Sequence, residues 1–410
     1  MSETQLPEVR ENIKVEKNDE DGQEYIVLYD DQCYAQQPLS FHLDFIPFLH
    51  LLNSNFTFEG LEARFKDQFG DDAEQIMDSF KNFTQILDNA GYLNTPRFQW
   101  IKNDIDNYIN SDIRPAICAG ASYSDDEAEL TKELDDILNS FDSSEVKTGA
   151  EMIIVPHIDF RIGEAAHKTY AAGYHTLKDS EPDLIVIFGT SHTGSSKRFI
   201  ITEKHFETPL GTVQTDGEII KKMRNVLTDS DEVIIDDLCH RYEHSIEIQV
   251  VLAQHYFKNK PFKILPILVN SFFNDIQTGS LPNEDEGFNR FLEVLKGIIQ
   301  SSGKKAIFIA SVDLAHVGKK FGDDFDAKLM LNDLKNEDQR LIHFLAMSDP
   351  DSFFNTISQA KDKYKICGLA PIYSMLKYQT PKECRFLHYD QWYEEETESA
   401  VSFASLAYYN

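Results

Sequence analysis

The chain has 410 residues, of which 41% are hydrophobic and 12% aromatic, enough to form two or three domains with substantial cores. Its formal net charge is −30. A surface of this charge repels phosphate backbones, so we expect no nucleic-acid partner. There is no run of about 18 apolar residues, which argues against a membrane span. The first residues lack a basic segment followed by an apolar one, so we expect a cytoplasmic protein.

The cysteines do not form the pattern of a disulfide framework. They are odd in number and widely spaced, without a CxxC pair, at positions 33, 118, 239, 367 and 384. Such usage is typical of a reducing compartment. We expect most of them to be small buried side chains.

The N-terminal quarter predicts a small separate module. Residues 1–24 are charged and poor in apolar groups, which favours a disordered arm, and residues 25–98 form the module. Within the module we expect a strand at 25–29, an apolar helical stretch at 41–52 interrupted by Pro47, and helices at 55–69 and 74–90. Thr57 is the expected N-cap of the first of these two helices, and Gly91 the residue that ends the second.

Three short helices followed by Tyr92 and Leu93 resemble a winged helix. More specifically, they are similar to the small peptide-recognition modules that accompany radical enzymes of peptide modification. Acidic side chains on the helices, among them Glu59, Asp67 and Asp78, argue against binding to DNA. The resemblance therefore implies docking of a peptide or a protein.

The remainder of the chain predicts an α/β domain. Residues 99–150 are expected to be a connector that carries an acidic amphipathic helix at 125–138. From 151 to 410, strands alternate with helices, which indicates a central parallel or mixed sheet flanked by helices. The expected strands are 152–157, 183–189, 198–203, 262–269, 305–311, 383–389 and 401–408. The expected helices are 163–177, 216–226, 244–257, 287–301, 323–346 and 368–377.

Polar residues follow three of these strands at the point where each apolar run ends. His157 follows the first, His192 follows the second after Gly189-Thr190-Ser191, and Asp313 and His316 follow the fifth. In an open α/β sheet, ligands bind beyond the carboxyl ends of the strands. The pattern therefore predicts a metal site or an acid/base site at this edge. Taken singly, His157 fits a histidine hydrogen-bonded beneath a loop about equally well.

Two further positions carry groups able to do chemistry. His244 opens an apolar helix between Glu243 and Glu247, and a neighbouring carboxylate orients an imidazole or raises its basicity. For Glu243 an exposed helix start remains the alternative, because acids favour that end of the helix dipole. Cys367 precedes a helix, where a thiolate is favoured and can ligate a metal or act as a nucleophile. A buried, inert cysteine is its alternative reading.

These motifs, in this order, resemble the Memo family over about residues 113–410. An upstream stretch agrees as well, with Arg114-Pro115-Ala116, Ala119-Gly120 and Tyr123 before the acidic helix. One stretch departs from the family pattern: Ile158-Asp159-Phe160 replaces the usual Ala-Gly-Tyr. The motifs that carry the resemblance are Val155-Pro156-His157, Gly189-Thr190-Ser191-His192, Glu243-His244-Ser245-Ile246-Glu247, Ser311-Val312-Asp313-Leu314-Ala315-His316 and Ile366-Cys367-Gly368.

The resemblance implies a fold like that of the class III extradiol dioxygenases and a metal held by His157, His192 and Cys367. The cysteine stands where those dioxygenases use a glutamate. His316, with Asp313, matches their acid/base position, and His244 lines the same cleft. The family implies Fe(II) or copper as the cofactor. A radical SAM enzyme and an AMMECR-type protein are the implied partners in a modification pathway.

Three functions fit these observations. The first is a redox enzyme with iron or copper at the two histidines and the thiolate. The second is a scaffold that holds a peptide in a vestigial active-site cleft. The third is a metal- or cysteine-dependent hydrolase, which ranks last because the sequence has no Gly-x-Ser-x-Gly elbow and no HExxH motif.

Overall fold

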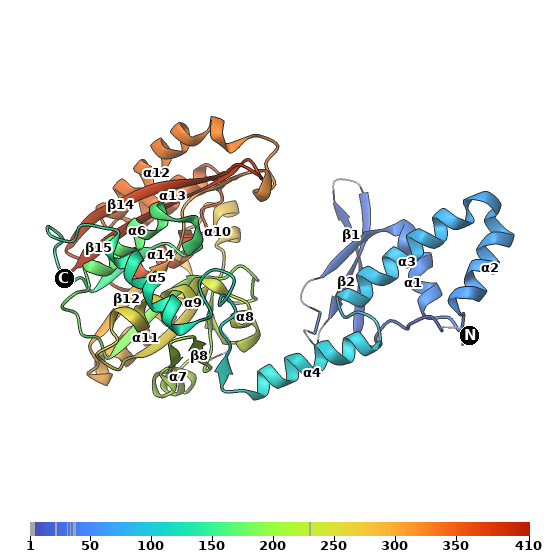
Figure 1. Cartoon of the computed structure of the whole chain (residues 1–410), viewed down its shortest axis with the longest axis horizontal. Coiled ribbons are helices and arrows are strands. Elements are labelled where there is room, and N and C mark those ends of the chain that lie inside the picture. Colours follow the sequence, from blue (N-terminus) through green and yellow to red (C-terminus); the bar gives the residue numbers. More distant parts are fainter. Residues whose placement is uncertain (1–4, 21–22, 31, 33, 36–37, 229–230) are drawn as a thin grey trace. The chain divides into compact units, whose positions relative to one another are not determined.

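The computed structural model describes residues 5–20, 23–30, 32, 34–35, 38–228 and 231–410. The chain forms two compact units, which divide between Ser111 and Asp112. Figure 1 shows a small N-terminal unit and a larger α/β unit that contains the rest of the chain. The described helices include none that is long and apolar enough to cross a membrane.

Unit 1 combines a three-stranded antiparallel sheet, ordered β1-β2-β3, with four α-helices that follow it in the chain. The strands and helices are β1 (Ile13–Glu20), β2 (Gln23–Asp30), β3 (Leu39–His42), α1 (Ile46–Leu52), α2 (Phe58–Phe69), α3 (Ala73–Asn89) and α4 (Pro96–Asn110), with short 3-10 turns at Leu43–Phe45 and Gly70–Asp72.

The prediction of a disordered arm over residues 1–24 is wrong for the described part of that range. β1 pairs with β2 along its whole length as an edge strand, so this charged segment is part of the sheet. Before β1, the guanidinium of Arg10 is buried, donates to Asp30 Oδ2 at 2.8 Å and lies 3.9 Å from the centre of the Phe98 ring. Residues 1–4 and 21–22 lie outside the described residues.

The helices predicted at 55–69 and 74–90 are confirmed as α2 and α3. Thr57 caps α2 by accepting a hydrogen bond from the Gly60 amide at 3.0 Å. The stretch 41–52, predicted as one interrupted helix, instead divides into the end of β3, a 3-10 turn and α1. Pro47 lies in the first turn of α1, where a missing N–H costs nothing, so this proline begins a helix and does not break one.

The boundary between the units differs from the prediction. Unit 1 extends to Ser111 and not to residue 98, because α4 buries Phe98, Ile105 and Tyr108. The predicted connector at 99–150 is therefore divided between the units. Its second half contains α5 (Glu127–Asn139), an amphipathic helix that packs on α6 (Glu164–His175) of unit 2.

Unit 2 is built on a mixed sheet, as predicted, with the strand order β10-β7-β11-β6-β12-β5-β15-β13 and β14 paired to β15. The four strands β11, β6, β12 and β5 are mutually parallel, whereas β15 runs antiparallel to β5. Its strands are β5 (Met152–Val155), β6 (Leu184–Thr190), β7 (Phe199–Ile201), β10 (Val233–Ile235), β11 (Lys263–Val269), β12 (Ala306–Ser311), β13 (His316–Gly318), β14 (Glu383–Glu394) and β15 (Ser399–Tyr409). A small second sheet contains β4 (Ile113–Arg114), β8 (His205–Thr208) and β9 (Gly211–Val213).

Helices cover both faces of this sheet. Met152 and Ile154 of β5 point into one hydrophobic cluster, and Ile153 and Val155 point into another, as the alternation along a strand requires. α5, α6 and α9 contribute to the second cluster, and α7, α11, α12, α13 and α14 to the first. The remaining helices are α7 (Gly217–Arg224), α8 (Asp237–Arg241), α9 (His244–Tyr256), α10 (Phe273–Thr278), α11 (Glu286–Ser302), α12 (Leu331–Ala346), α13 (Pro350–Gln359) and α14 (Leu369–Tyr378), with 3-10 turns at Phe160–Ile162, Pro282–Glu284, Lys319–Phe321 and Ala327–Leu329.

Candidate metal centre

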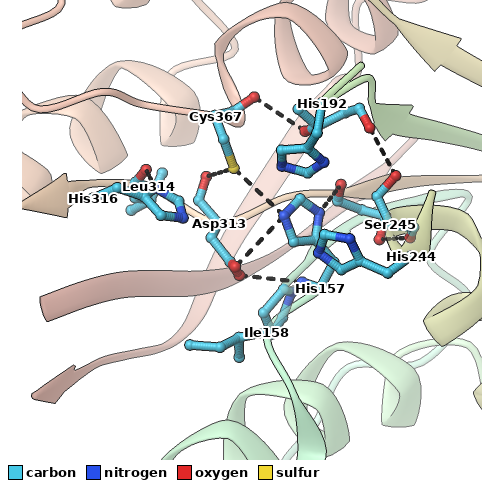
Figure 2. A network of polar contacts seen from close by, with 12 residues as sticks. His157, Ile158, His192, His244, Ser245, Asp313, Leu314, His316 and Cys367 are labelled. Carbon is cyan, nitrogen blue, oxygen red and sulfur yellow. Dashed lines mark hydrogen bonds and ion pairs between the residues drawn. The ribbon is translucent and has the colours of Figure 1, made fainter. Parts of the chain in front are cut away.

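Three segments that are distant in the sequence bring His157, His192 and Cys367 together. His157 lies two residues beyond β5 and His192 two residues beyond β6, both at the carboxyl edge of the sheet. One ligand atom from each of the three residues lies within 4.8 Å of the other two. Figure 2 shows the Cys367 sulfur directed at the His157 ring, where Sγ and Nε2 are 3.6 Å apart.

Gly368 allows the Cys367 loop to reach this edge. Its amide donates to the carbonyl oxygen of Asp313 at 3.0 Å. A Cβ at position 368 would come within 2.6 Å of that same oxygen, so only glycine permits the approach without a shift of the backbone. The Cys367 thiol therefore lies close to Asp313, in the segment that follows β12.

The His157 ring is fixed by the sheet. Its Nδ1 lies 2.9 Å from the carbonyl oxygen of Ser311. A carbonyl only accepts, so Nδ1 carries the hydrogen and Nε2 keeps a free lone pair directed at Cys367. The side chain is 2% exposed, and burial, reinforced by His244 and His192, holds the pKa of His157 well below its usual value. A neutral imidazole in this tautomer is ready to ligate a metal.

The His192 ring is fixed by a carboxylate. Its Nδ1 lies 3.0 Å from Glu243 Oε1, and its backbone amide donates to Glu243 Oε2 at 2.9 Å. Burial lowers the pKa of His192, but the hydrogen bond and the charge of Glu243 outweigh it, and the net shift is upward. With Nδ1 at the carboxylate, Nε2 is the ring nitrogen that could ligate a metal.

The Cys367 thiol lies in a site that disfavours its charged form when no cation is present. Burial and the nearby Asp313 carboxyl raise the pKa of Cys367 well above its ordinary value. A bound metal would reverse this preference, because the ion stabilises the thiolate and the proton is released to solvent. The set of two imidazoles and one thiol fits a soft or borderline ion such as iron or copper.

His244 also lies at this site, at the first position of α9. Its ring centre is 5.0 Å from that of His157 and 4.9 Å from that of His192. Burial lowers the pKa of His244, which keeps the ring neutral. Glu247, expected to support it, points elsewhere: it pairs with the buried Arg114 and accepts from the Cys118 amide at 2.8 Å.

His316 and Asp313 complete the group. His316 Nδ1 faces two carbonyl oxygens, of Leu314 at 3.1 Å and of Lys365 at 3.2 Å, so its Nε2 is the free acceptor. Burial lowers the pKa of His316 to about 4. Asp313 is also buried, with one carboxylate oxygen 3.6 Å from His157 Nε2. Burial raises the pKa of Asp313 to about 7.

All six predicted residues, His157, His192, His244, Asp313, His316 and Cys367, line one cavity of about 1100 Å³. Its walls are otherwise mixed: Phe321 and Trp392 supply aromatic surface, and Arg161, Lys320 and Lys365 supply cations. Ligand sites are typically concave, with a few convergent polar groups in a largely apolar lining. The other described cysteines, 118, 239 and 384, form no disulfide with one another or with Cys367 and do not line this cavity, and Cys33 lies outside the described residues.

Glu243 is the residue that sequence reasoning undervalued. It was expected either to orient the neighbouring His244 or to lie at an exposed helix start, and no contact with His192 was predicted; it is 2% exposed and lies 3.0 Å from His192 Nδ1. A carboxylate directly before a candidate site histidine was the available signal. His192, Glu243 and His244 also form a second group whose potential ligand atoms lie within 4.8 Å of one another.

The fold and this cluster define an α/β protein with a candidate two-histidine, one-cysteine metal centre at the carboxyl edge of its sheet. A family model described as Memo-like protein matches residues 114–407. The chain belongs to the Memo family, as the sequence motifs predicted.

Individual relatives agree with this assignment. A MEMO1 family protein of Aquifex aeolicus is 27% identical over 395 residues, covering 93% of this chain and 97% of that protein. A MEMO1 family protein of Pyrococcus furiosus is 30% identical over 313 residues, covering 72% of this chain and 98% of that protein. Among solved structures, an uncharacterized protein from Escherichia coli K12 aligns with a TM-score of 0.33 and 12% identity, covering 63% of this chain and 99% of that one.

Proposed function

We propose that this protein is a cytoplasmic non-heme metal protein that acts as a dioxygenase-like redox enzyme. Fe(II) or copper is held by Nε2 of His157, Nε2 of His192 and Sγ of Cys367. The observation that carries the proposal is that one ligand atom from each of these three residues lies within 4.8 Å of the other two, in the lining of one large cavity. Three protein ligands leave coordination positions open for substrate, as catalytic metals require.

When bound, the ion would supply electron transfer to dioxygen and Lewis-acid polarisation of a substrate oxygen. The residues of the chain supply the rest. His316 Nε2, unprotonated at neutral pH, accepts a proton from the substrate. His244 and Asp313 offer further groups that hold or donate protons. The aromatic rings of Phe321 and Trp392 hold the apolar part of the substrate and exclude water.

The partners implied by the family extend the proposal. The protein works with a radical SAM enzyme and an AMMECR-type protein in a modification pathway, and unit 1 binds the peptide or protein that the pathway modifies. The supporting observation is that unit 1 has its own hydrophobic core, which includes Phe65, Phe80 and Leu87, as an independent recognition module requires.

The test is anaerobic purification followed by elemental analysis and oxygen-uptake measurement. We expect about one iron or copper ion per chain and oxygen consumption with an electron donor. Cys367→Ala is expected to lose the metal, whereas the matched control Cys384→Ala on β14 keeps it. Full metal content in Cys367→Ala would contradict the proposed ligand set.

A peptide-binding scaffold is the second candidate. The observation that favours it is the cavity volume of about 1100 Å³, which exceeds the roughly 300–1000 Å³ that small-molecule sites usually have. It predicts capture of peptides by protein that lacks metal, without oxygen uptake after metal is restored. Titration calorimetry with a peptide library separates the two candidates.

A further inference from the structure

Glu243 makes more contacts in the candidate site than a helix cap needs. Its side chain accepts from the Ser245 amide at 3.0 Å, which caps α9. The same carboxylate lies 3.0 Å from His192 Nδ1 and 3.3 Å from His244 Nδ1. A buried carboxylate requires partners, and here two of those partners are imidazoles of the cavity wall.

These contacts differ between the two rings. A carboxylate only accepts hydrogen bonds, so the bond to Glu243 places hydrogen on His192 Nδ1 and leaves Nε2 toward the ion, whereas His244 makes an ion-pair contact with the same carboxylate. The two rings stack with their centres 4.9 Å apart and their planes 21° from parallel. One side chain thus sets the tautomer of His192 and contacts both of these neighbouring imidazoles.

We propose that Glu243 is the positioning residue of the metal centre: it presents His192 Nε2 to the ion and holds His244 beside the open coordination positions. The proposal rests on the proposed function, because it takes His192 as a ligand. Carboxylates that hydrogen-bond a ligating histidine typically change metal affinity by about 10–100-fold when they are removed. Glu243 itself does not bind the ion.

A purely structural role makes a different prediction. If Glu243 only caps α9, its loss lowers stability and leaves the affinity for metal unchanged. Asp285 provides the matched control, since it caps α11 by accepting from the Phe288 amide at 2.8 Å and does not line the cavity. Loss of this cap affects a helix without touching the candidate site.

The experiment titrates the metal-free full chain with Co(II) under anaerobic conditions. The thiolate-to-cobalt absorption band reports binding at Cys367, and thermal unfolding of each variant reports the helix. We expect Kd to rise about 10-fold in Glu243→Gln, which keeps one acceptor, and about 100-fold in Glu243→Ala. The thiolate band should still appear at saturation. Asp285→Asn and Asp285→Ala should keep the wild-type Kd.

Each outcome decides a separate point. Wild-type Kd in both Glu243 variants overturns the positioning role and leaves the metal centre intact. A loss of affinity of the same size in the Asp285 variants also overturns it, because helix destabilisation then explains the effect. A different spectrum at saturation for Glu243→Gln contradicts the claim that this residue is not a ligand. Absence of a thiolate band in the wild-type chain overturns the proposed function itself.

Discussion

The contacts of His316 assign it a defined chemical role. Two carbonyl oxygens hold its Nδ1 hydrogen, and the remaining Nε2 is a base without being a metal ligand in the proposed set. We expect His316→Gln to keep its metal and to lose about 10²–10⁴-fold in turnover. Metal analysis and oxygen uptake on the same sample check both parts. Loss of the metal in this variant would place His316 among the ligands.

The pH dependence of turnover follows from the same residue. Burial lowers the pKa of His316 to about 4, so the base form persists down to that pH. The acidic limb of kcat/KM is therefore expected near pH 4, not near the ordinary histidine value of about 6.5. A limb at 6 or above, absent from His316→Gln, would contradict this assignment.

His240 gives a stability prediction outside the proposed ligand set. It is buried, its Nε2 lies 3.0 Å from the Ile200 carbonyl oxygen, and burial lowers its pKa to about 4. Between pH 4 and about 6.5 the unfolded chain binds a proton that the folded chain does not. The free energy of unfolding therefore rises with pH across this window, and it falls as the pH drops.

We expect His240→Gln, which retains a donor but cannot titrate, to reduce this slope by at most about 1.4 kcal/mol per pH unit. Chemical unfolding at several pH values, followed through Trp392 in a Trp100→Phe background, measures the slope for unit 2. The exposed His343→Gln serves as the control and should keep the wild-type slope. An unchanged slope in His240→Gln would show that the imidazole is already charged in the fold.

At the level of elements, the packing of α6 on the sheet controls where His157 lies. A Cβ at Gly173 of α6 would meet Ser405 Oγ at 2.7 Å and come closer still to Val155 Cγ1. Val155 ends β5, two residues before His157. Gly173→Ala is expected to lower the free energy of unfolding by about 1–3 kcal/mol and to weaken metal binding by shifting this strand.

Gly297 is the matched control for this substitution. It also lies inside a helix, α11, but a Cβ there meets nothing within 4 Å. Gly297→Ala should raise the free energy of unfolding by about 0.5–1 kcal/mol with no change in metal binding. Equal effects of the two substitutions would rule out close packing as the cause.

Strands and helices with long apolar runs were predictable, because a buried strand such as β6 and an amphipathic helix such as α11 follow a local rule. Two of the strands that were missed lack such a rule. β13 has only three residues and depends on its pairing with β15. β1 has a charged sequence and depends on its pairing with β2. Pairing between segments cannot be read from one segment.

The candidate site likewise contains features that could be predicted from the sequence and features that could not. Residues at strand ends could be predicted because the carboxyl edge of a sheet gathers them. The partner of Glu247 could not be predicted. Its spacing from His244 on the helix allows a contact between them, but the packing of the folded chain pairs Glu247 with Arg114. The contact between Glu243 and His192 could not be predicted either, because it depends on how the loop after β6 approaches the start of α9.

At the level of the whole molecule, the two units make separate predictions. All six residues of the candidate site lie in the unit that begins at Asp112. A chain that starts there is expected to fold and to bind Co(II) with a Kd within about twofold of the full chain, as two units with separate cores allow. Comparative titration measures this. A large loss of affinity would mean that unit 1 contributes to the centre.

The paired atoms Cys367 Sγ and His157 Nε2 belong to residues 210 positions apart in the chain. An ion bound between them closes a loop that spans half of the protein, in the manner of a removable cross-link. It adds stability in proportion to the logarithm of the free metal concentration. Metal starvation would then first appear as faster proteolysis and a lower melting temperature, so cellular abundance of the protein would track the supply of its ion.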